Sequence, residues 1–494
     1  MFYPDIEKVR SLAGKYNIIP VSMEVYADME TPISIFKRIE AEGHCFLLES
    51  VEGGEKWARY SFIGRNPFLT VKSSGNRSVV VKRDGDASIV EGNPIELLKS
   101  LMSSYKGPLL PELPRFNGGA VGFFGYDTIR YIENLPNVPP DDLGIPELHF
   151  MFADELIAFD HFKQKMHIIV NLHTDGNLER NYSSAVDRIR EIHREILTSG
   201  WKVSGRQSAA PAKDGDGLRI TSNISKERFC ENVLKAKEYI RNGDIFQVVL
   251  SQRLCAETDS EPFNVYRALR LINPGPYMYY LKFDDYTIAG SSPEMLVRVE
   301  GKKVESCPIA GTRRRGASGE EDVRLEKELI GDEKERAEHI MLVDLGRNDI
   351  GKVSNFGSVQ VRDFMHIERF SHVMHIVSCV QGELKDGMTS FDALSAVLPA
   401  GTLSGAPKIR AMEIIDELEN VKRCQYGGAV GYLSFDGNLD SCITIRTIVF
   451  KDGKAYIQAG GGVVADSVPE NEYEESMNKA MATIKALEEA EKVR

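Results

Sequence analysis

The sequence has no excess of positive charge and no long hydrophobic run. Its 494 residues hold 61 Lys and Arg against 73 Asp and Glu, a formal net charge of −12. Nucleic acids and anionic membranes bind surfaces rich in Lys and Arg, so this balance argues against both as partners. No stretch approaches the roughly 18 apolar residues of a membrane span. The first residues, MFYPDIEKVR, lack a basic head before an apolar run, so no signal peptide is expected.

Cysteine is sparse and never clustered. The seven cysteines stand singly, none in a CxxC pair and none in a Gly-x-Cys-x-Gly setting. This spacing argues against a cysteine zinc site. An odd count without framework spacing is typical of a protein of the reducing cytoplasm.

The composition is that of a folded protein, with 42% apolar and 27% charged residues. The length suits two or three domains or one large packed unit. Residues 199–217, SGWKVSGRQSAAPAKDGDG, have little to bury and are typical of a linker or surface loop. We therefore expect an N-terminal region over 1–198 and a second region over 218–494, although this cut need not be a spatial boundary.

Hydrophobic periodicity predicts strands and helices in both regions. The predicted strands are 44–50, 78–83, 246–254, 277–283 and 287–292, and the predicted helices are 182–197, 229–241, 332–345, 407–418 and 469–493. A short repeat, GGAVGF at Gly118 and GGAVGY at Gly427, is consistent with a duplicated strand unit or with chance.

Two carboxylate pairs at helical spacing are candidates for a cation site. Glu335 and Glu338 lie three residues apart on one predicted helix, and Glu472 and Glu475 do so on another. Residues at i and i+3 share a helix face, so two facing helices could offer hard oxygen ligands to Mg²⁺. Taken alone, solvated helix surface explains such pairs more often.

Other candidates are individually weak. The triplet from Gly460 to Gly462 lets backbone N–H groups approach an anion, or forms a tight turn. Arg446, among apolar neighbours, suits a substrate carboxylate or a structural ion pair. His375 lies in an apolar run, where a histidine is more often a core residue than a base. Glu294 in GSSPEML would have a raised pKa if desolvated, as a general acid needs.

Several strings taken together resemble the chorismate-utilising enzymes, and among them component I of anthranilate synthase. The strings are GDIFQVVLSQ, SSPEMLVR, PIAGTRRRG, EHIMLVDLGRND, LPAGTLSGAPK, YGGAVGY, IRT and QAGGGVVADSVPENEYEESMNKA. They follow one another through the second region, and LLES at Leu47 extends the resemblance into the first. The resemblance implies an α+β fold of two large, mostly antiparallel β-sheets packed as a sandwich with outer helices.

The resemblance also implies a reaction and a set of site residues. The reaction is the lyase conversion of chorismate and ammonia to anthranilate and pyruvate in tryptophan biosynthesis. Glu338 and Glu475 would bind Mg²⁺, with Glu335 and Glu472 nearby. Glu294 would be the general acid at the C4 hydroxyl, and His375 would serve the later pyruvate elimination. The implied chorismate contacts are Gly311, Thr312, Thr402, Tyr426, Arg446, Gly460, Gly461, Gly462 and Lys479.

Two positions separate this reaction from its relatives. Isochorismate and salicylate synthases place a water-activating Lys where Gln247 stands, and an amide cannot be that base. Aminodeoxychorismate synthase component I places a nucleophilic Lys where Ala310 stands. Gln247 and Ala310 therefore favour ammonia as the nucleophile at C2. The alternatives are aminodeoxychorismate synthase component I, an aminodeoxyisochorismate synthase, or a non-catalytic tryptophan-sensing protein.

Partners and control follow from the same resemblance. Because the chain has no Gly-x-Cys-x-Gly elbow, it is expected to receive ammonia from a separate glutamine amidotransferase subunit, in a heterotetramer with two of each subunit. LLES and NPGPYM resemble the tryptophan-binding motifs of feedback-inhibited enzymes, although Gly275 stands where Ser is common. The implied tryptophan pocket comprises Glu49, Ser50, Asn273, Pro276, Tyr277 and Met278.

Overall fold

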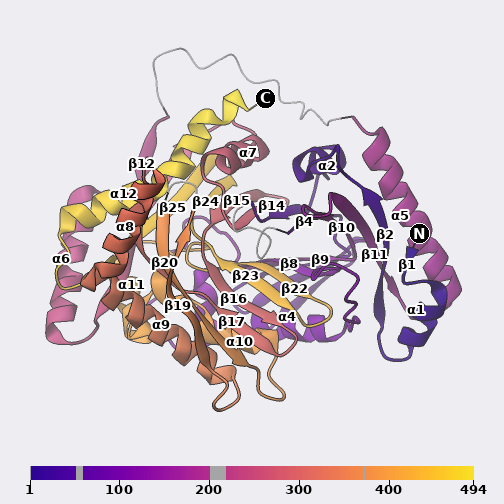
Figure 1. Cartoon of the computed structure of the whole chain (residues 1–494), viewed down its shortest axis with the longest axis horizontal. Coiled ribbons are helices and arrows are strands. Elements are labelled where there is room, and N and C mark those ends of the chain that lie inside the picture. Colours follow the sequence, from indigo (N-terminus) through magenta and orange to yellow (C-terminus); the bar gives the residue numbers. More distant parts are fainter. Residues whose placement is uncertain (1, 52–58, 201–217, 371–372, 494) are drawn as a thin grey trace.

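Two large antiparallel sheets form the centre of the molecule, and helices lie on their outer faces (Figure 1). The computed structural model describes residues 2–51, 59–200, 218–370 and 373–493. The expected α+β fold with two mostly antiparallel sheets is confirmed.

The first sheet has 13 strands among the described residues. In spatial order they are β1 (Phe2–Tyr3), β2 (Ile18–Tyr26), β11 (Lys165–His173), β10 (Glu155–Asp160), β4 (Tyr60–Arg65), β3 (Cys45–Glu49), β14 (Tyr277–Lys282), β15 (Tyr286–Ser292), β24 (Thr447–Lys451), β25 (Lys454–Val463), β13 (Gln247–Glu257) and β12 (Ile220–Ser222), with β21 (Gly405–Ala406) pairing with β13.

The second sheet has 12 strands in the part of the chain that the structure describes. Their order is β18 (Ile309–Arg314), β20 (Val373–Glu383), β17 (Lys303–Ser306), β16 (Met295–Glu300), β23 (Leu439–Ile443), β22 (Ala429–Ser434), β8 (Gly119–Phe124), β9 (Leu148–Ala153), β5 (Leu69–Ser74), β6 (Arg77–Lys82) and β7 (Ala87–Glu91), with β19 (Gln360–Arg369) pairing with β20.

Both sheets combine strands from the two sequence regions. In the first sheet β3 pairs with β14, so that Glu49 lies opposite Met278. In the second sheet β8 pairs with β22, so that Gly122 lies opposite Gly431. The two copies of the GGAVG repeat are therefore neighbouring strands. Residues 201–217, most of the expected linker, lie outside the described residues, and the division at 199–217 stays a prediction.

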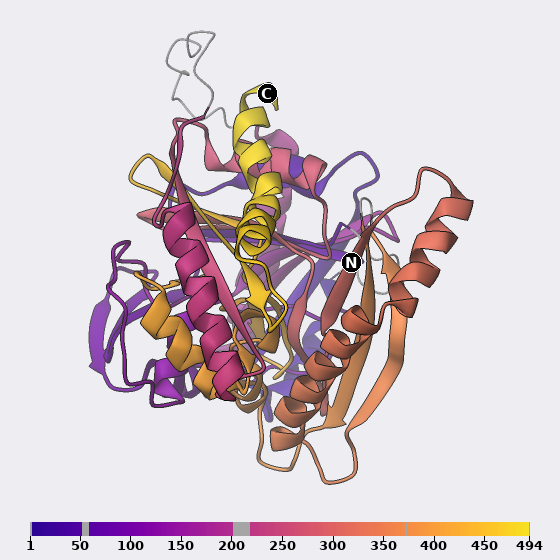
Figure 2. The same cartoon turned by 90° about the vertical axis from the view of Figure 1, so that its left-hand side faces the viewer.

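The helices that carry the candidate carboxylates begin at ordinary signals. Asp332 caps α9 by accepting bonds from the backbone N–H groups of Lys334 and Glu335, and Pro469 opens α12. Figure 2 shows α6 and α12 lying side by side. The helix bounds are α1 (Ile6–Ala13), α2 (Pro32–Ile39), α4 (Pro94–Ser103), η1 (Tyr126–Tyr131), α5 (Leu178–Thr198), α6 (Lys226–Asn242), α7 (Pro262–Ile272), α8 (Gly319–Gly331), α9 (Glu333–Val353), α10 (Ser390–Val397), η2 (Gly401–Leu403), α11 (Lys408–Leu418), α12 (Pro469–Glu489) and η3 (Ala490–Lys492).

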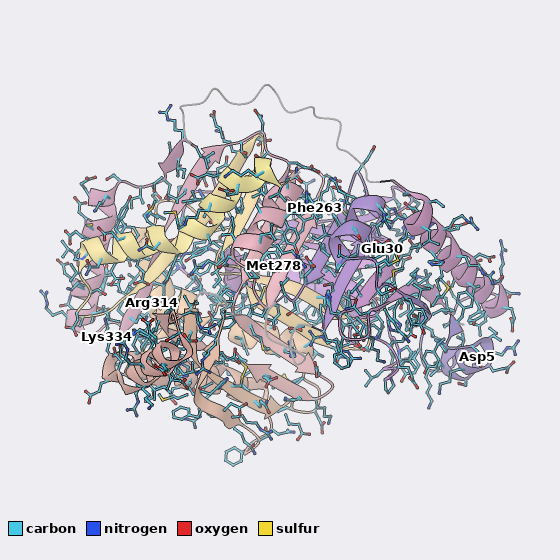
Figure 3. All side chains as sticks on the ribbon, turned by 45° about the horizontal axis from the view of Figure 1, so that its top comes forward. Asp5, Glu30, Phe263, Met278, Arg314 and Lys334 are labelled. Atoms are coloured by element: carbon cyan, nitrogen blue, oxygen red, sulfur yellow. A yellow bond between two sulfur atoms is a disulfide. The ribbon has the colours of Figure 1, made fainter. Side chains whose placement is uncertain are left out.

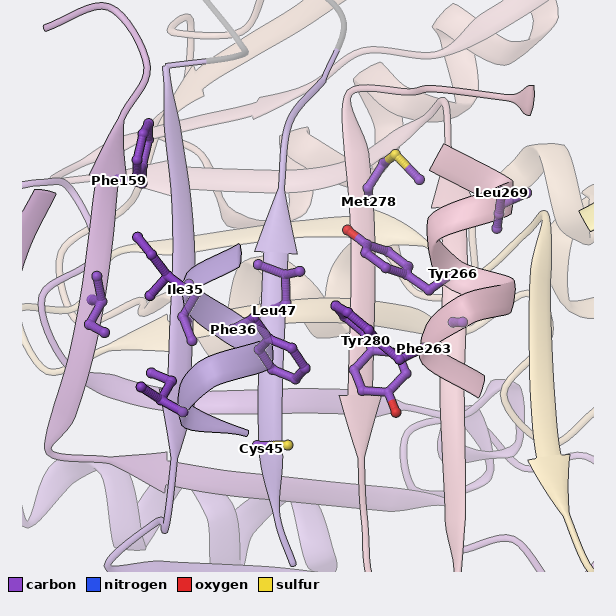
Figure 4. Packing of buried hydrophobic residues seen from close by; sticks show 14 of the residues in the cluster. Ile35, Phe36, Cys45, Leu47, Phe159, Phe263, Tyr266, Leu269, Met278 and Tyr280 are labelled. Atoms are coloured by element: carbon purple, nitrogen blue, oxygen red, sulfur yellow. The ribbon is translucent and has the colours of Figure 1, made fainter. Parts of the chain in front are cut away.

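One hydrophobic core joins the two sequence regions. Phe36 of α2 stacks on Phe263 of α7 with ring centroids 4.8 Å apart, and Tyr280 of β14 packs edge-on against both rings (Figure 4). Complete burial of a large apolar side chain contributes roughly 1.5–3 kcal/mol to folding. The N-terminal region is thus held to the rest of the chain by shared core packing.

Cys307 and Cys379 form a disulfide although 72 residues separate them. Cys307 lies in the connection between β17 and β18, and both of these strands pair with β20, which carries Cys379. The bond follows from strand pairing, and the scattered cysteine spacing does not reveal it. Within the described residues, no helix is long and apolar enough to span a membrane.

Candidate active site

Gln247, the first residue of β13, lies beside one of the predicted metal ligands. Its amide nitrogen donates to Oε1 of Glu338 on α9 over 3.4 Å. Its amide oxygen is buried and has no hydrogen-bond partner in the described structure. A Cβ on Gly462 would come within 2.3 Å of the amide nitrogen. Glycine at 462 therefore leaves the space that Gln247 occupies, and the unpaired oxygen is an acceptor for a ligand.

The glycine triplet lies inside β25 and not in a turn. A Cβ on Gly461 would lie 3.1 Å from Glu472 and 3.6 Å from Glu475, so α12 presents both carboxylates to this strand. Lys479, one turn further along α12, contacts Glu475 at 2.7 Å and donates to the Gly460 carbonyl at 3.1 Å.

The carboxylates of α9 and α12 influence one another across the site. Burial, assisted by the charges of Glu335 and Glu475, raises the pKa of Glu338. Burial also raises the pKa of Glu472, and the Glu475 charge adds to it. Among the described residues, no three of these carboxylates converge to within 4.8 Å of one another.

This donor set fits a divalent cation. Carboxylates are the hard oxygen ligands that Mg²⁺ prefers, and the buried Oε2 of Glu472 has no hydrogen-bond partner in the described structure. A cation would also relieve the repulsion between the two helices. Glu335 lies at the edge of the group, where Arg313 of β18 contacts it at 3.1 Å.

Glu294 is a buried acid between β15 and β16. Burial raises its pKa to about 8, so the carboxyl group carries its proton at neutral pH. The hydroxyl of Thr402 donates to Oε1 of Glu294 at 3.2 Å. A protonated carboxyl group in such an enclosed position can act as a general acid.

His375 of β20 has a defined tautomer. Its Nδ1 lies 3.0 Å from the carbonyl oxygen of Gly311 and 3.0 Å from the hydroxyl of Thr312. A carbonyl can only accept, so Nδ1 bears the hydrogen and Nε2 keeps the lone pair. Burial lowers the pKa of His375, and the Arg446 charge adds to this effect. The ring is therefore neutral at pH 7 and can accept a proton.

Arg446 and Tyr426 lie on the side of the site formed by β24, β25 and α12. Arg446 has a positive φ of 53° and donates to the Lys479 carbonyl at 2.6 Å. Burial lowers the pKa of Arg446, and the charges of Tyr426 and Glu475 act in the opposite direction. The Tyr426 ring lies 5.6 Å from the guanidinium of Arg423.

Tyr426 lies next to a buried ion pair that the sequence did not predict. Arg423 is fully buried, where it binds Glu419 at 2.8 Å and the Leu403 carbonyl at 2.7 Å. Because opposite charges four residues apart are usually a solvated surface pair, the spacing of Glu419 and Arg423 gives no sign of this burial.

A second site lies between the sheets, where β3 and β14 face β22 and β23. We call this the Glu49 cavity. It encloses about 500 Å³ between its walls, the open mouth included, and five residues of the implied tryptophan pocket line it. Those residues are Glu49, Ser50, Pro276, Tyr277 and Met278. Met278 lies in the middle of the molecule, between Arg314 and Glu30 in the view of Figure 3.

The predicted residues of the Glu49 cavity differ in what they offer a ligand. One oxygen of Glu49 accepts from Tyr266 at 2.6 Å and from Arg270 at 3.1 Å. The other oxygen of Glu49 and the hydroxyl of Ser50 are buried with no partner among the described residues. Asn273 is not among the lining residues of the cavity, and its carbonyl instead accepts from Ser291 at 2.6 Å.

The opposite wall of the Glu49 cavity carries charges that the sequence did not reveal. Asp440 of β23 contacts Arg115 at 3.2 Å and Arg298 at 3.1 Å, and the Tyr277 hydroxyl donates to it at 3.0 Å. The only signs in the sequence were Arg298 and Asp440, which lie between apolar residues in the strands MLVRVE and LDSCI.

Comparison with known proteins gives one family. The model of the chorismate binding enzyme family matches residues 43–485. An anthranilate synthase component 1 from Acetivibrio thermocellus is 69% identical over 494 residues, which are 100% of both chains.

Solved structures give the same picture. A crystal structure of anthranilate synthase component I from Streptococcus pneumoniae is 40% identical, covers 93% of this chain and 99% of its own, and superposes with a TM-score of 0.77. The menaquinone-specific isochorismate synthase from Escherichia coli, at 17% identity and a TM-score of 0.70, shares the fold.

Proposed function

The chain belongs to the chorismate binding enzyme family, and from this premise we propose that it converts chorismate and ammonia into anthranilate and pyruvate. The single observation that carries the chemistry is Glu294, a buried carboxyl group with a pKa of about 8 that accepts a hydrogen bond from Thr402 and feels the charge of Lys479, which in turn contacts Glu475. Hydroxide is a poor leaving group, so loss of the C4 hydroxyl of chorismate requires an acid that is protonated at neutral pH.

The remaining residues divide the work between binding and proton transfer. The Arg446 guanidinium and Lys479 bind carboxylates of chorismate, with Tyr426, Thr312 and the backbone of Gly311 and β25 beside them. Glu294 gives its proton to the departing C4 hydroxyl, and Thr402 orients its carboxyl group. The unpaired oxygen of Gln247 accepts a hydrogen bond from the ammonia that adds at C2. The Nε2 lone pair of His375 is available to take the C2 proton in the pyruvate elimination.

Magnesium is the expected cofactor. Glu338 and Glu475 would hold it directly, and Glu335 and Glu472 directly or through water. When bound, the ion would stabilise negative charge at the ring carboxylate. Lys479 contacts Glu475 at 2.7 Å and is placed to turn to the substrate.

Ammonia comes from a second protein in this proposal. The sequence has no Gly-x-Cys-x-Gly elbow, so the chain cannot itself hydrolyse glutamine by that route. We expect a glutamine amidotransferase subunit as partner, two copies of each chain in the complex, and a cytoplasmic location.

Tryptophan is the expected inhibitor, bound in the Glu49 cavity. The free oxygen of Glu49 and the Ser50 hydroxyl meet its ammonium group, and Pro276 and Met278 enclose the indole. The cavity bridges the two sequence regions, so tryptophan would favour one relative arrangement of them. Chorismate then binds less well by linkage.

The alternatives make different products. Aminodeoxychorismate synthase component I would need a lysine at Ala310, and a non-catalytic tryptophan sensor would form no product. The purified chain, incubated with chorismate, Mg²⁺ and ammonium, should form fluorescent anthranilate, and glutamine should not replace ammonium. An aminated product that keeps its enolpyruvyl group, or no product, would contradict the proposal.

A further inference from the structure

A second cavity borders Glu294, and the mechanism above does not use it. Glu294, Ser306 and Thr402 lie on its wall together with Asp349 of α9. Its volume available to water is about 30 Å³, and a buried water needs about 10–15 Å³. The cavity therefore has room for roughly two waters, and its wall offers several polar groups to bind them.

Asp349 connects this cavity to the surface. One of its oxygens accepts from Lys408, which is buried at the start of α11, at 2.5 Å. The other accepts from Lys352 at 3.2 Å, and the Lys352 side chain is 59% exposed. The Lys408 ammonium also donates to the Val397 carbonyl at 3.1 Å. A buried carboxylate is thus held with one oxygen near solvent and its side chain on the cavity wall.

The proposed reaction creates a need for such a connection. In each turnover the O–H bond of Glu294 breaks, its proton joins the departing hydroxyl to form water, and Glu294 remains as a carboxylate. The ammonia that adds at C2 carries one hydrogen more than the amine of anthranilate keeps, and this proton leaves to solvent. The proton removed from C2 in the elimination is matched by the proton that turns the enolpyruvyl methylene into the methyl group of pyruvate. The balance therefore closes without an oxidant or reductant, and one proton must reach buried Glu294 in every cycle.

We propose that the cavity between Glu294 and Asp349 returns this proton, with Asp349 and bound water as the relay from the surface at Lys352. This inference rests on the proposed function, because it takes Glu294 as the acid. Asp349 lies in GRND and Lys408 in LSGAPK, so the relay gives both strings a role. Lys408 is a positioning residue whose ammonium balances the charge of the Asp349 carboxylate.

The test separates the first turnover from later ones. Glu294 is protonated at rest, so the first turnover needs no relay. Asp349→Asn keeps the size of the side chain but cannot carry a proton. With enzyme in excess over chorismate, its rate of anthranilate formation should stay within about twofold of the parent. With chorismate in excess, kcat should fall about tenfold, and imidazolium, a small proton donor, should restore part of it.

Two further variants test whether the effect of Asp349→Asn comes from the cavity. Val397→Leu adds one methylene to the cavity wall and should also lower kcat more than the first-turnover rate. Asp344→Asn removes an exposed acid from the same helix, where it pairs with Arg347 at 2.9 Å, and should change neither rate.

Three outcomes would overturn the relay. They are equal slowing of first and later turnovers in Asp349→Asn, an unchanged kcat in both cavity variants, and failure of imidazolium to raise kcat. If the parent chain forms no anthranilate at all, the proposed function fails instead.

Discussion

The active site and the Glu49 cavity both keep charged groups away from water, but they balance those charges differently. In the Glu49 cavity, Asp440 lies between two arginines and a tyrosine hydroxyl. In the candidate active site, burial and the charge of Glu475 raise the pKa values of Glu338 and Glu472, and one oxygen of Glu472 lacks a partner in the described structure. A site with paired charges keeps its shape when empty, whereas one with repelling carboxylates gains stability when a cation and an anionic substrate bind.

A small apolar cluster lies between the two sites. Met295 follows Glu294, Cys307 lies two residues before β18, and Tyr277, on the wall of the Glu49 cavity, packs against this cluster. The disulfide to Cys379 holds this cluster to the strand of His375. Ligand-driven movement on one side therefore has a packed route to the other.

The largest expected effect is confined to the active site. Glu338→Gln should lower kcat by on the order of 10³-fold or more, because a neutral amide binds Mg²⁺ poorly. Circular dichroism and tryptophan binding should match the parent. Glu474→Gln changes an exposed acid beside Glu475 on α12 and should have no effect. Loss of tryptophan binding in Glu338→Gln would show that the two sites are not separable.

The next effect concerns the proton on Glu294. The acid must be protonated, so activity should be high below pH 8 and fall about tenfold per pH unit well above it, following the pKa of about 8. In Glu294→Gln, kcat should drop about 10²- to 10³-fold and this pH dependence should disappear. An alkaline limb that persists in Glu294→Gln would assign the titration to another group.

How far the sequence predicts the two sites differs for physical reasons. The candidate active site was proposed almost entirely from motifs in one region, because Glu294, Gln247 and the glutamate pairs lie in short strings with typical chemistry. The fold class followed from the same resemblance. The opposite wall of the Glu49 cavity contains Arg115 and Asp440, which lie far apart in the sequence and are brought together by the sheet. No local string therefore predicts this wall.

The disulfide and the cavity beside Asp349 were unpredictable for a similar reason. Each forms where elements distant in sequence meet, as Cys307 meets Cys379 through β20 and Asp349 meets Lys408 at the start of α11. Local spacing therefore indicates neither the Asp349–Lys408 ion pair nor the disulfide.

A smaller effect should be confined to the Glu49 cavity. Ser50→Phe places a ring where the indole would lie, so the tryptophan concentration for half inhibition should rise at least about tenfold. Turnover without tryptophan should stay within about twofold. Ser11→Phe, on the exposed face of α1, is the matched control. The inhibition of both variants is measured as chorismate turnover against tryptophan concentration. Unchanged inhibition in Ser50→Phe would place the effector elsewhere.

The smallest expected effect is at Asn273, which does not line the cavity. Asn273→Ala keeps the backbone carbonyl that accepts from Ser291, so half inhibition by tryptophan should shift by less than about twofold. The same inhibition curve checks this, and a shift as large as that of Ser50→Phe would mean that Asn273 contacts the inhibitor.

The pairing of β8 with β22 also bears on how the protein is made. Strand β8 (Gly119–Phe124) leaves the ribosome about 310 residues before its partner β22 (Ala429–Ser434). At about 5–20 residues per second, one edge of β8 waits roughly 15–60 s for that partner. Every residue of β8 is buried in the finished molecule, so during synthesis a fully apolar strand edge is open to other chains. The interval before β22 is made is therefore the stage of synthesis at which β8 is most exposed to pairing with other chains.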